Sequence, residues 1–526
     1  MSKPTFAYGK DQLSCSIALS LARGEAQGII ESDTREKLAH CCLAVEQMAA
    51  GDVPVYGINT GFGPLCTTTI SAGQTKILQR NLLISHAVGV GDPISIEASR
   101  LMLVLKLHAL AQGFSGVSIA TLERIMYLLD NWLTPVVPSK GSVGASGDLA
   151  PLAHLFLPLI GEGYLYSTEP GEGTQKFQPS KQLLDVPPLE LGPKEGLGLI
   201  NGTQFIAAHA VLLVERFHRC LSQADVVAAM MLEGLQGSVK PFTAELHQLR
   251  PFPANQHVAA RLRELLIGSE ILEDHIDCDR VQDPYSLRCM PQVHGASRTA
   301  WLHLKQLTEI EINSVTDNPV VLDEHTAISG GNFHGQPLAM ALDYACLAAA
   351  EMGNISDRRV YLALEGGHGL PKLLMEDTGI NSGYMILQYT TAALVSENKT
   401  LCFPASADSV PTSLGQEDHV SMGSISGRKA LQVVGNLEKI LGIELLTAAQ
   451  AFEFRKPLRS GPLLEEVHNR LRKLVPFAEV DRVFAPDIEI AARLIQDGQL
   501  LQWTYELAAE QSLDFQQMQR GEFETF

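Results

Sequence analysis

The sequence predicts a mainly α protein, in which a long central helical bundle follows a smaller, mixed and loop-rich N-terminal part. Several long segments carry apolar residues at helical spacing, whereas strand signals are short and few. No internal repeat or low-complexity linker separates independent domains. At 526 residues the chain exceeds the usual span of one core, so we expect one large cooperative unit or a few packed subdomains.

The strongest helical pattern lies in residues 420–455, where apolar side chains recur every three or four positions. These side chains are Leu431, Val434, Leu437, Leu441, Leu445, Ala448 and Phe452. The same pattern predicts further helices at 96–112, 203–233, 297–315 and 336–364. Strand signals are limited to short stretches such as "TPVVPS" (134–139) and "NPVVLD" (318–323).

Loop signals are densest near residues 161–197 and suggest a soft boundary between two parts of one cooperative unit. We expect an N-terminal domain at 1–200, which carries the loop 141–150, and a long-helix bundle at 201–526. Helices that are apolar on most faces must be buried on most faces, either in a bundle or at a subunit interface. The sequence therefore predicts a homo-oligomer, with a dihedral tetramer as the expected form.

Charge and cysteine usage restrict the class of partner and the compartment. The formal net charge of -19, from 59 acidic and 40 basic residues, argues against a nucleic-acid or anionic-membrane surface. A small molecule is the expected partner. The nine cysteines contain no C-x-x-C pair, which suits reduced thiols. With no signal-peptide pattern and no apolar run long enough for a membrane span, we expect a cytoplasmic protein.

The stretch "GSVGASGDLAPLAHL" (141–155) places a pliable turn directly before an apolar helix. If the amide nitrogen of Gly147 closes onto the carbonyl carbon of Ala145, a five-membered ring forms. Loss of water from this ring and from the Ser146 side chain leaves an exocyclic methylidene. Glycine suits the third position because a side chain would block the approach. The tripeptide alone is common, and taken by itself it is far better explained as a flexible turn before a helix.

The extended stretch resembles the signature of the aromatic amino-acid ammonia-lyase and aminomutase family, whose members build a methylidene-imidazolone electrophile from such an Ala-Ser-Gly. Other motifs follow in the family's order over positions 50 to 455. They are "VYGINTGFGPL" (55–65), "LINGTQ" (199–204), "VQDPYSLRCMPQVHG" (281–295), "NSVTDNP" (313–319), "GGNFHGQP" (330–337) and "NSGYM" (381–385).

The resemblance implies an autocatalytic 4-methylidene-imidazol-5-one from Ala145, Ser146 and Gly147, with no dissociable cofactor and no metal. The ring would accept the substrate amine, and Tyr56 would remove the β-proton. A phenol is a weak base at its ordinary pKa of about 10, so we expect its surroundings, such as helix ends, to deprotonate it.

Further site residues also follow from the resemblance. Arg288 would hold the substrate carboxylate, for which a guanidinium fork is suited. Asn201 and Tyr285 would lie beside the ring, and Phe333 would pack near it. The resemblance also implies a homotetramer with active sites shared between subunits.

Histidine is the favoured substrate. The pair Ser85-His86 and the segment "QEDHVSM" (416–422) resemble histidine-specific members, as does Gln282. A carboxylate at Glu417 can accept a ring N–H, whereas a phenyl ring would leave it unpaired. The Gly-Gln pair at 335–336 is instead closer to the tyrosine branch. Tyrosine ammonia-lyase activity and aminomutase activity therefore stay open.

Three other classes of protein are weaker alternatives. A metal enzyme could use "EDHIDCD" (273–279) or "QEDHV" (416–420), but neither has the spacing of a known zinc or calcium site. Glycines 57, 61 and 63 could form a phosphate cradle, yet no Gly-Lys-Ser/Thr follows. A non-catalytic helical scaffold would carry no chromophore.

Overall fold

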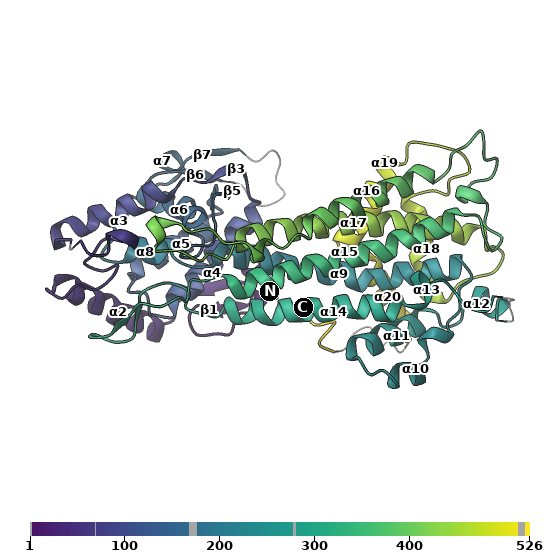
Figure 1. Ribbon diagram of the computed structural model, residues 1–526, viewed down its shortest axis with the longest axis horizontal. Helices are drawn as coiled ribbons and strands as arrows, with labels where there is room; N and C mark the ends of the chain where they lie inside the picture. Colours follow the sequence, from purple (N-terminus) through teal and green to yellow (C-terminus); the bar gives the residue numbers. More distant parts are fainter. Residues whose placement is uncertain (1–2, 69, 168–175, 277–279, 514–520) are drawn as a thin grey trace. The chain divides into compact units, whose positions relative to one another are not determined.

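The computed structural model describes residues 3–68, 70–167, 176–276, 280–513 and 521–526, and most of its elements are labelled in Figure 1. Helices α1 to α20 account for most of them, and the strands form four small sheets. The predicted mainly α class is confirmed. No helix within the described ranges combines the length and the apolarity that a membrane crossing needs.

The chain divides into two compact units. The first consists of Met1–Leu212, Leu304–Asp343 and Pro404–Arg428, and the second of Leu213–His303, Tyr344–Phe403 and Lys429–Phe526. The predicted boundary at residue 200 lies close to the first break. The return of two later segments to the first unit depends on tertiary contacts, which local patterns do not encode.

Eight helices lie wholly in the first unit: α1 (Cys15–Ala22), α2 (Ser32–Ala50), α3 (Ala72–His86), α4 (Ile96–Ala111), α5 (Ile119–Asp130), α6 (Leu149–Phe156), α7 (Ser180–Leu183) and α8 (Glu195–Ile200). Helix α4 is buried at nearly every position, as its almost continuous apolar sequence requires. Ser95 begins it by accepting a hydrogen bond from the Ala98 amide at 3.1 Å. Helices α3, α6 and α8 pack against one another.

The strands of the first unit are short. They are β1 (Thr5–Ala7), β2 (Gln27–Ile29), β3 (Val90–Pro93), β4 (Thr134–Pro135), β5 (Pro138–Lys140), β6 (Tyr164–Tyr166), β7 (Phe177–Pro179), β8 (Val320–Val321) and β9 (Ala327–Ile328). Strands β1 and β2 pair in parallel, while β3–β5, β4–β6–β7 and β8–β9 pair antiparallel. The stretch "TPVVPS" supplies β4 and the start of β5, and "NPVVLD" supplies β8.

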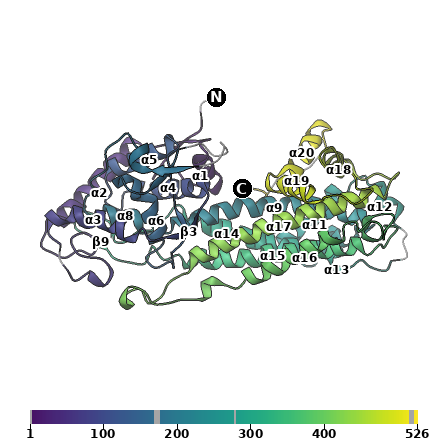
Figure 2. The same cartoon turned by 90° about the horizontal axis from the view of Figure 1, so that it is seen from above.

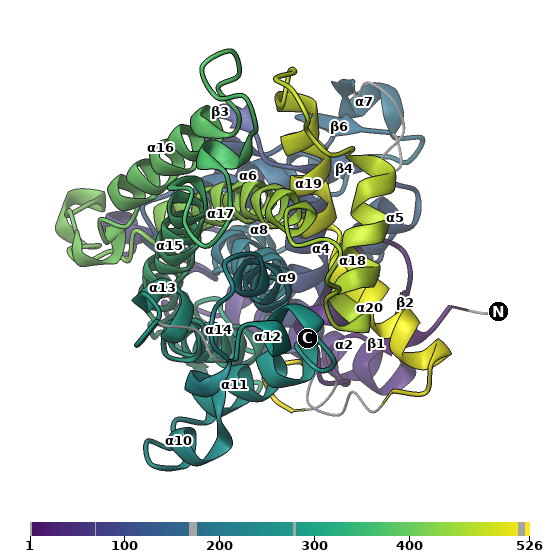
Figure 3. The same ribbon diagram turned by 90° about the vertical axis from the view of Figure 1, so that its right-hand side faces the viewer.

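Four long helices contribute residues to both units: α9 (Gln204–Gly234), α14 (Met290–Glu311), α15 (Gln336–Leu364) and α17 (Gly423–Glu453). The helices predicted at 203–233, 297–315, 336–364 and 420–455 match them. In the second unit α9 lies at the centre of the bundle (Figure 3), and nearly all of its side chains there are buried. Its neighbour α14 contacts it where the Trp301 indole donates to the Val214 carbonyl at 2.8 Å.

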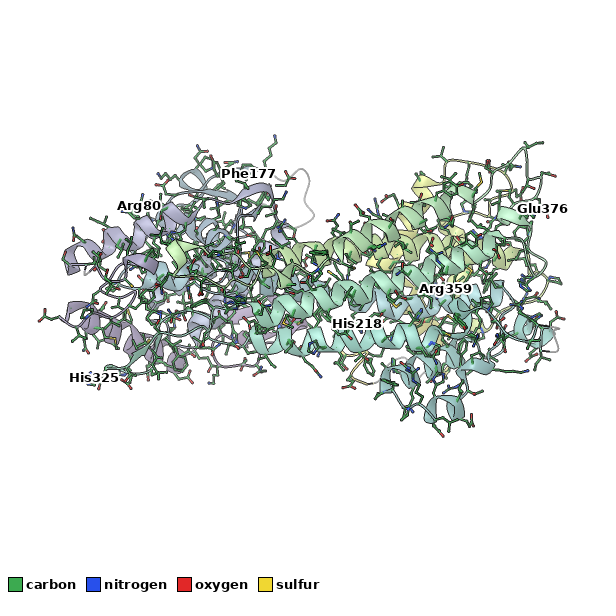
Figure 4. The ribbon with its side chains drawn as sticks, viewed as in Figure 1. Arg80, Phe177, His218, His325, Arg359 and Glu376 are labelled. Atoms are coloured by element: carbon green, nitrogen blue, oxygen red, sulfur yellow. The ribbon has the colours of Figure 1, made fainter. Side chains whose placement is uncertain are left out.

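Buried ion pairs join the helices of the second unit. Arg359 of α15, seen on its helix in Figure 4, donates to Glu444 of α17 at 3.0 Å, and both side chains are fully buried. The remaining helices of this unit are α10 (Ala244–Gln248), α11 (Pro253–Leu265), α12 (Glu270–Asp274), α13 (Tyr285–Arg288), α16 (Met385–Leu401), α18 (Pro462–Leu474), α19 (Ala485–Gln496) and α20 (Gln499–Glu510). Helices α18 to α20 gather on one side of the bundle (Figure 2).

Candidate active site

The Ala145–Ser146–Gly147 turn has a strained backbone. Ser146 has a φ of 49° and Gly147 a φ of 76°, both in the left-handed region. A Cβ at Gly147 would lie 2.2 Å from the carbonyl oxygen of Gly202, so only glycine fits there. Ala145 is buried against Val420 and Met422. Surrounding structure thus holds the turn in a conformation that few residues adopt.

Helix α6 begins directly after this turn and fixes its far end. The Asp148 amide donates to the Gly202 carbonyl at 2.7 Å. The Asp148 side chain is completely buried and accepts from the Ile206 amide at 3.0 Å and the Ser142 hydroxyl at 3.1 Å. Burial raises the pKa of Asp148 to about 7. The predicted rigid helix after a pliable loop is confirmed.

Asn201 lies on the other side of the turn, immediately after α8. Its Nδ2 donates to the Ser146 carbonyl oxygen at 3.1 Å. Its Oδ1 is buried and has no hydrogen-bond partner among the described residues. A buried amide oxygen without a donor is costly, so this atom suits a donor that a bound group would bring. The strained turn and this orphaned oxygen fit a prosthetic ring built from residues 145–147.

A cavity of about 480 Å³ opens beside the Ser146 side chain, within the range expected for a small-molecule site. Its walls include six of the predicted site residues: Tyr56, Ser85, His86, Ser146, Asn201 and Glu417. They belong to segments far apart in the sequence but to the same unit. The Ser146 hydroxyl donates to Glu417 Oε1 at 2.8 Å.

Tyr56 and His86 bring titratable groups to this cavity. The Tyr56 hydroxyl oxygen accepts a hydrogen bond from the Gly63 amide at 3.3 Å. Burial, together with the nearby charges of Cys66 and Glu417, nevertheless raises the pKa of Tyr56. Desolvation outweighs the single amide donor, so the described residues around Tyr56 favour the protonated phenol. The expectation that these surroundings deprotonate Tyr56 is therefore wrong. Burial lowers the pKa of His86, and its Nδ1 lies 3.0 Å from the Ser85 hydroxyl.

The other predicted site residues do not line this cavity. Phe333 belongs to the first unit but is not among the residues that line the cavity. Gln282, Tyr285 and Arg288 belong to the second unit, on and just before α13. There the Arg288 guanidinium lies 4.5 Å from the centre of the Tyr285 ring, and the ring residue is 71% exposed. Arg288 Nε donates to the Asp283 carbonyl at 2.9 Å.

The metal hypothesis gains no support from side-chain geometry. Within the described residues, no group of three or more His, Cys, Asp or Glu side chains could hold a metal ion. Residues 277–279 of "EDHIDCD", with Cys278 among them, lie outside the described residues. Gly61 and Gly63, two of the three glycines considered above as a phosphate cradle, line the cavity beside Ser146.

Sequence reasoning did not identify three residues that hold this site together. Thr412 and Ser413 donate hydrogen bonds to Glu417 Oε2 at 2.9 and 2.7 Å. Lys106 of α4 is fully buried and donates to the Asn201 carbonyl at 2.6 Å. A lysine within the apolar run "LMLVLKLHALA" was a signal that could have drawn attention to this position.

Comparison with known proteins identifies relatives over nearly the whole chain. The matching family model is that of the aromatic amino acid lyases, over residues 13–473. Histidine ammonia-lyase of Myxococcus xanthus is 45% identical over 506 residues, which cover 95% of this chain and 98% of that protein. The crystal structure of histidine ammonia-lyase from Trypanosoma cruzi is 36% identical with a TM-score of 0.88, covering 99% of this chain and 98% of its own. Tyrosine aminomutase from Streptomyces globisporus is 34% identical with a TM-score of 0.88, covering 96% and 99%.

The cavity beside the strained Ala-Ser-Gly turn is of the kind at which enzymes bind small substrates. The extent of the family match settles the class of enzyme, and the chain belongs to the aromatic amino acid lyase family. The family predicted from the motifs is confirmed.

Proposed function

We propose that this chain is an ammonia-lyase that removes ammonia from L-histidine and releases trans-urocanate. Its relatives include histidine ammonia-lyases that match more than nine-tenths of both chains. The single observation that carries the choice of substrate is the Glu417 carboxylate, which faces the cavity next to Ser146. An imidazole N–H can donate to this carboxylate, whereas a phenyl ring cannot.

We infer that residues 145–147 mature into 4-methylidene-imidazol-5-one. When formed, this group supplies an electrophile for the substrate amine, which otherwise leaves poorly. Support comes from the left-handed Ser146, the lack of space for a Cβ at Gly147 and the orphaned Oδ1 of Asn201. Asn201 Nδ2 holds the Ser146 carbonyl in place. The reaction then needs no metal, and full activity after exhaustive chelation is the expected result.

Residues of the chain supply the remaining chemistry. Tyr56 is the base that removes the β-proton, and Asn201 orients the reacting end of the substrate. Ser85, His86 and Glu417 bind the imidazole ring. Tyr285 lies beside the prosthetic ring and relays protons, and Phe333 packs near that ring. Arg288 binds the substrate carboxylate, and Gln282 is a further substrate-binding residue.

We propose a homotetramer in which the second unit of one subunit completes the site of another. The high exposure of Tyr285, beside the Arg288 guanidinium, supports this arrangement, because an exposed aromatic next to a cation suits an interface. Sedimentation of the pure protein tests it, and a stable monomer would contradict it. We also propose that the enzyme is cytoplasmic.

Incubation with histidine, tyrosine and phenylalanine in turn tests the proposed function. We expect the absorbance of a conjugated acrylate from histidine and little from the other two. Product from tyrosine alone would contradict the proposal.

An aminomutase acting on tyrosine is the second candidate. The likeness to the Streptomyces globisporus structure and the Gly335-Gln336 pair favour it. The same incubations distinguish the two candidates, because an aminomutase forms a β-amino acid as its product, whereas a lyase accumulates the acrylate.

A further inference from the structure

The segment from Thr412 to Glu417 folds back on itself in a tight turn. The Thr412 amide donates to the Glu417 carbonyl at 2.8 Å, and the Glu417 amide donates back at 3.4 Å. Between them, Ser413 and Leu414 have φ values of 48° and 56°. Non-glycine residues persist in this region only where other contacts determine the conformation. The turn ends at Glu417, and we infer that its strained conformation serves to position the Glu417 side chain.

Both oxygens of the Glu417 carboxylate are held by hydroxyl groups. Oε2 accepts from Thr412 Oγ1 at 2.9 Å and from Ser413 Oγ at 2.7 Å. Oε1 accepts from Ser146 Oγ at 2.8 Å. We call Thr412 and Ser413 the hydroxyl clamp. Hydrogen bonds to a carboxylate are among the stronger ones in proteins, so the clamp fixes the plane and the position of the group.

The bond to Ser146 differs in kind from the two bonds of the clamp. In the maturation proposed above, the Ser146 Oγ leaves as water, and with it goes the donor to Oε1. The clamp is untouched by that step, because Thr412 and Ser413 lie outside residues 145–147. Oε1 is then an acceptor without a donor, on a carboxylate that lines the cavity and cannot turn away.

We propose that Thr412 and Ser413 are the positioning residues that set the preference for an imidazole ring. The inference rests on the proposed function. A ring N–H of imidazole lies on the ring itself, whereas the hydroxyl of a phenol projects one bond further out. A clamped Glu417 cannot retreat to admit the longer phenol, and a phenyl ring leaves Oε1 unpaired. A released Glu417 could swing aside, and discrimination would fall.

The test compares Thr412→Val, Ser413→Ala and the double variant with the wild type. Thr412→Ser, which keeps the hydroxyl, is the conservative variant. Ser406→Ala is the matched control, since the Ser406 hydroxyl has no described role at Glu417 and lies in the same part of the chain. For each protein, kcat and KM are measured with histidine and with tyrosine. The near-UV difference spectrum against Ser146→Ala reports whether residues 145–147 have matured.

We expect each clamp variant to mature normally and to lose about tenfold in kcat/KM for histidine, mainly through KM, because each bond to a carboxylate is worth roughly 1.4 kcal/mol or more. The ratio of kcat/KM for histidine over tyrosine should fall in step. Thr412→Ser and Ser406→Ala should retain the wild-type ratio.

Three results would overturn the proposal, and they are distinguishable. A wild type that prefers tyrosine removes both the proposed function and the role of the clamp. A wild type that prefers histidine, with an unchanged ratio in the double variant, removes only the clamp. Loss of the near-UV absorbance in the clamp variants would assign these hydroxyls to maturation and not to specificity.

Discussion

The Lys106 ammonium donates a 2.6 Å hydrogen bond to the carbonyl oxygen of Asn201, and both residues are buried in the first unit. Burial lowers the pKa of Lys106 to about 7. The Asn201 side chain in turn holds the Ser146 carbonyl. Through Asn201, this lysine therefore helps to hold the turn of residues 145–147, which must close into the ring. The hydrogen bond to Asn201, and not the apolar packing of α4, explains why a lysine is buried at position 106.

Replacing Lys106 by Met should reduce maturation more than stability. The Met side chain fills the space, and the loss of a donor to Asn201, about 1–3 kcal/mol, is offset by removal of a desolvated ammonium. We expect the near-UV absorbance per chain to fall while far-UV circular dichroism is retained. Lys140→Met, at an exposed lysine of β5, is the control. Full absorbance in Lys106→Met would contradict this role.

The same lysine makes stability depend on pH. Its folded pKa lies below its unfolded value of 10.5, so between pH 7 and 10.5 the unfolded chain binds more protons than the folded one. The contribution of Lys106 therefore raises stability as pH increases through this window. Urea unfolding at several pH values should show this slope in the wild type and a weaker one in Lys106→Met.

Gly147→Ala should prevent maturation. A Cβ there would lie 2.2 Å from the Gly202 carbonyl oxygen, and the φ of 76° adds strain of about 1–3 kcal/mol. The turn must shift away from the geometry that ring closure needs, so we expect no near-UV difference from Ser146→Ala. Gly73→Ala is the matched control, because a Cβ at Gly73 of α3 meets nothing within 4 Å. Wild-type absorbance in Gly147→Ala would refute the argument.

Tyr56→Phe should abolish most turnover while the absorbance of the prosthetic group survives. A general base contributes about a hundredfold to ten-thousandfold, and Phe cannot accept a proton. Burial, with Cys66 and Glu417, raises the pKa of Tyr56, so the phenolate fraction of the wild type should increase up to and beyond pH of about 10. We expect kcat/KM to rise with pH in the wild type and in the exposed control Tyr164→Phe. A variant Tyr56→Phe with near-normal turnover would exclude Tyr56 as the base.

The sequence predicted the parts of the molecule that local pattern or family motif determines. Periodicity predicted α4, α9, α15 and α17, and the motifs predicted Tyr56, Ser146 and Glu417 at one cavity. The pairing of Ser146 with Glu417 spans 271 positions, and only the folded chain brings the two together.

Two kinds of feature escaped prediction for physical reasons. The hydroxyl clamp depends on left-handed residues at 413 and 414, which have no sequence signature because neither is glycine. The pKa of Tyr56 depends on the balance between desolvation and hydrogen bonding, and residue types alone do not give that balance.

Glu524, two residues before the end of the sequence, is part of a buried charge network in the second unit. Its Oε1 lies 2.7 Å from His257 Nε2 and 3.0 Å from Arg261 Nη1, and Arg298 Nη1 is 3.3 Å away. Burial opposes ionisation, but these neighbours outweigh it and lower the pKa of Glu524 from 4.5 to about 2. Phe523, beside it, is also buried. Phe523 and the Glu524 side chain are thus packed into the second unit.

Glu524→Gln should therefore destabilise the protein in a pH-dependent way. Because the folded pKa is depressed, the stabilisation is complete above pH 4.5 and is lost as pH falls towards 2. The shift corresponds to about 3 kcal/mol at neutral pH, which Glu524→Gln removes while leaving two buried arginines short of a counter-charge. Urea unfolding followed by tryptophan fluorescence, at pH 7 and in mild acid, measures both the loss and its pH dependence. Glu522→Gln, at an exposed neighbour, should behave as wild type, and equal losses in the two variants would show that the buried network does not stabilise the chain end.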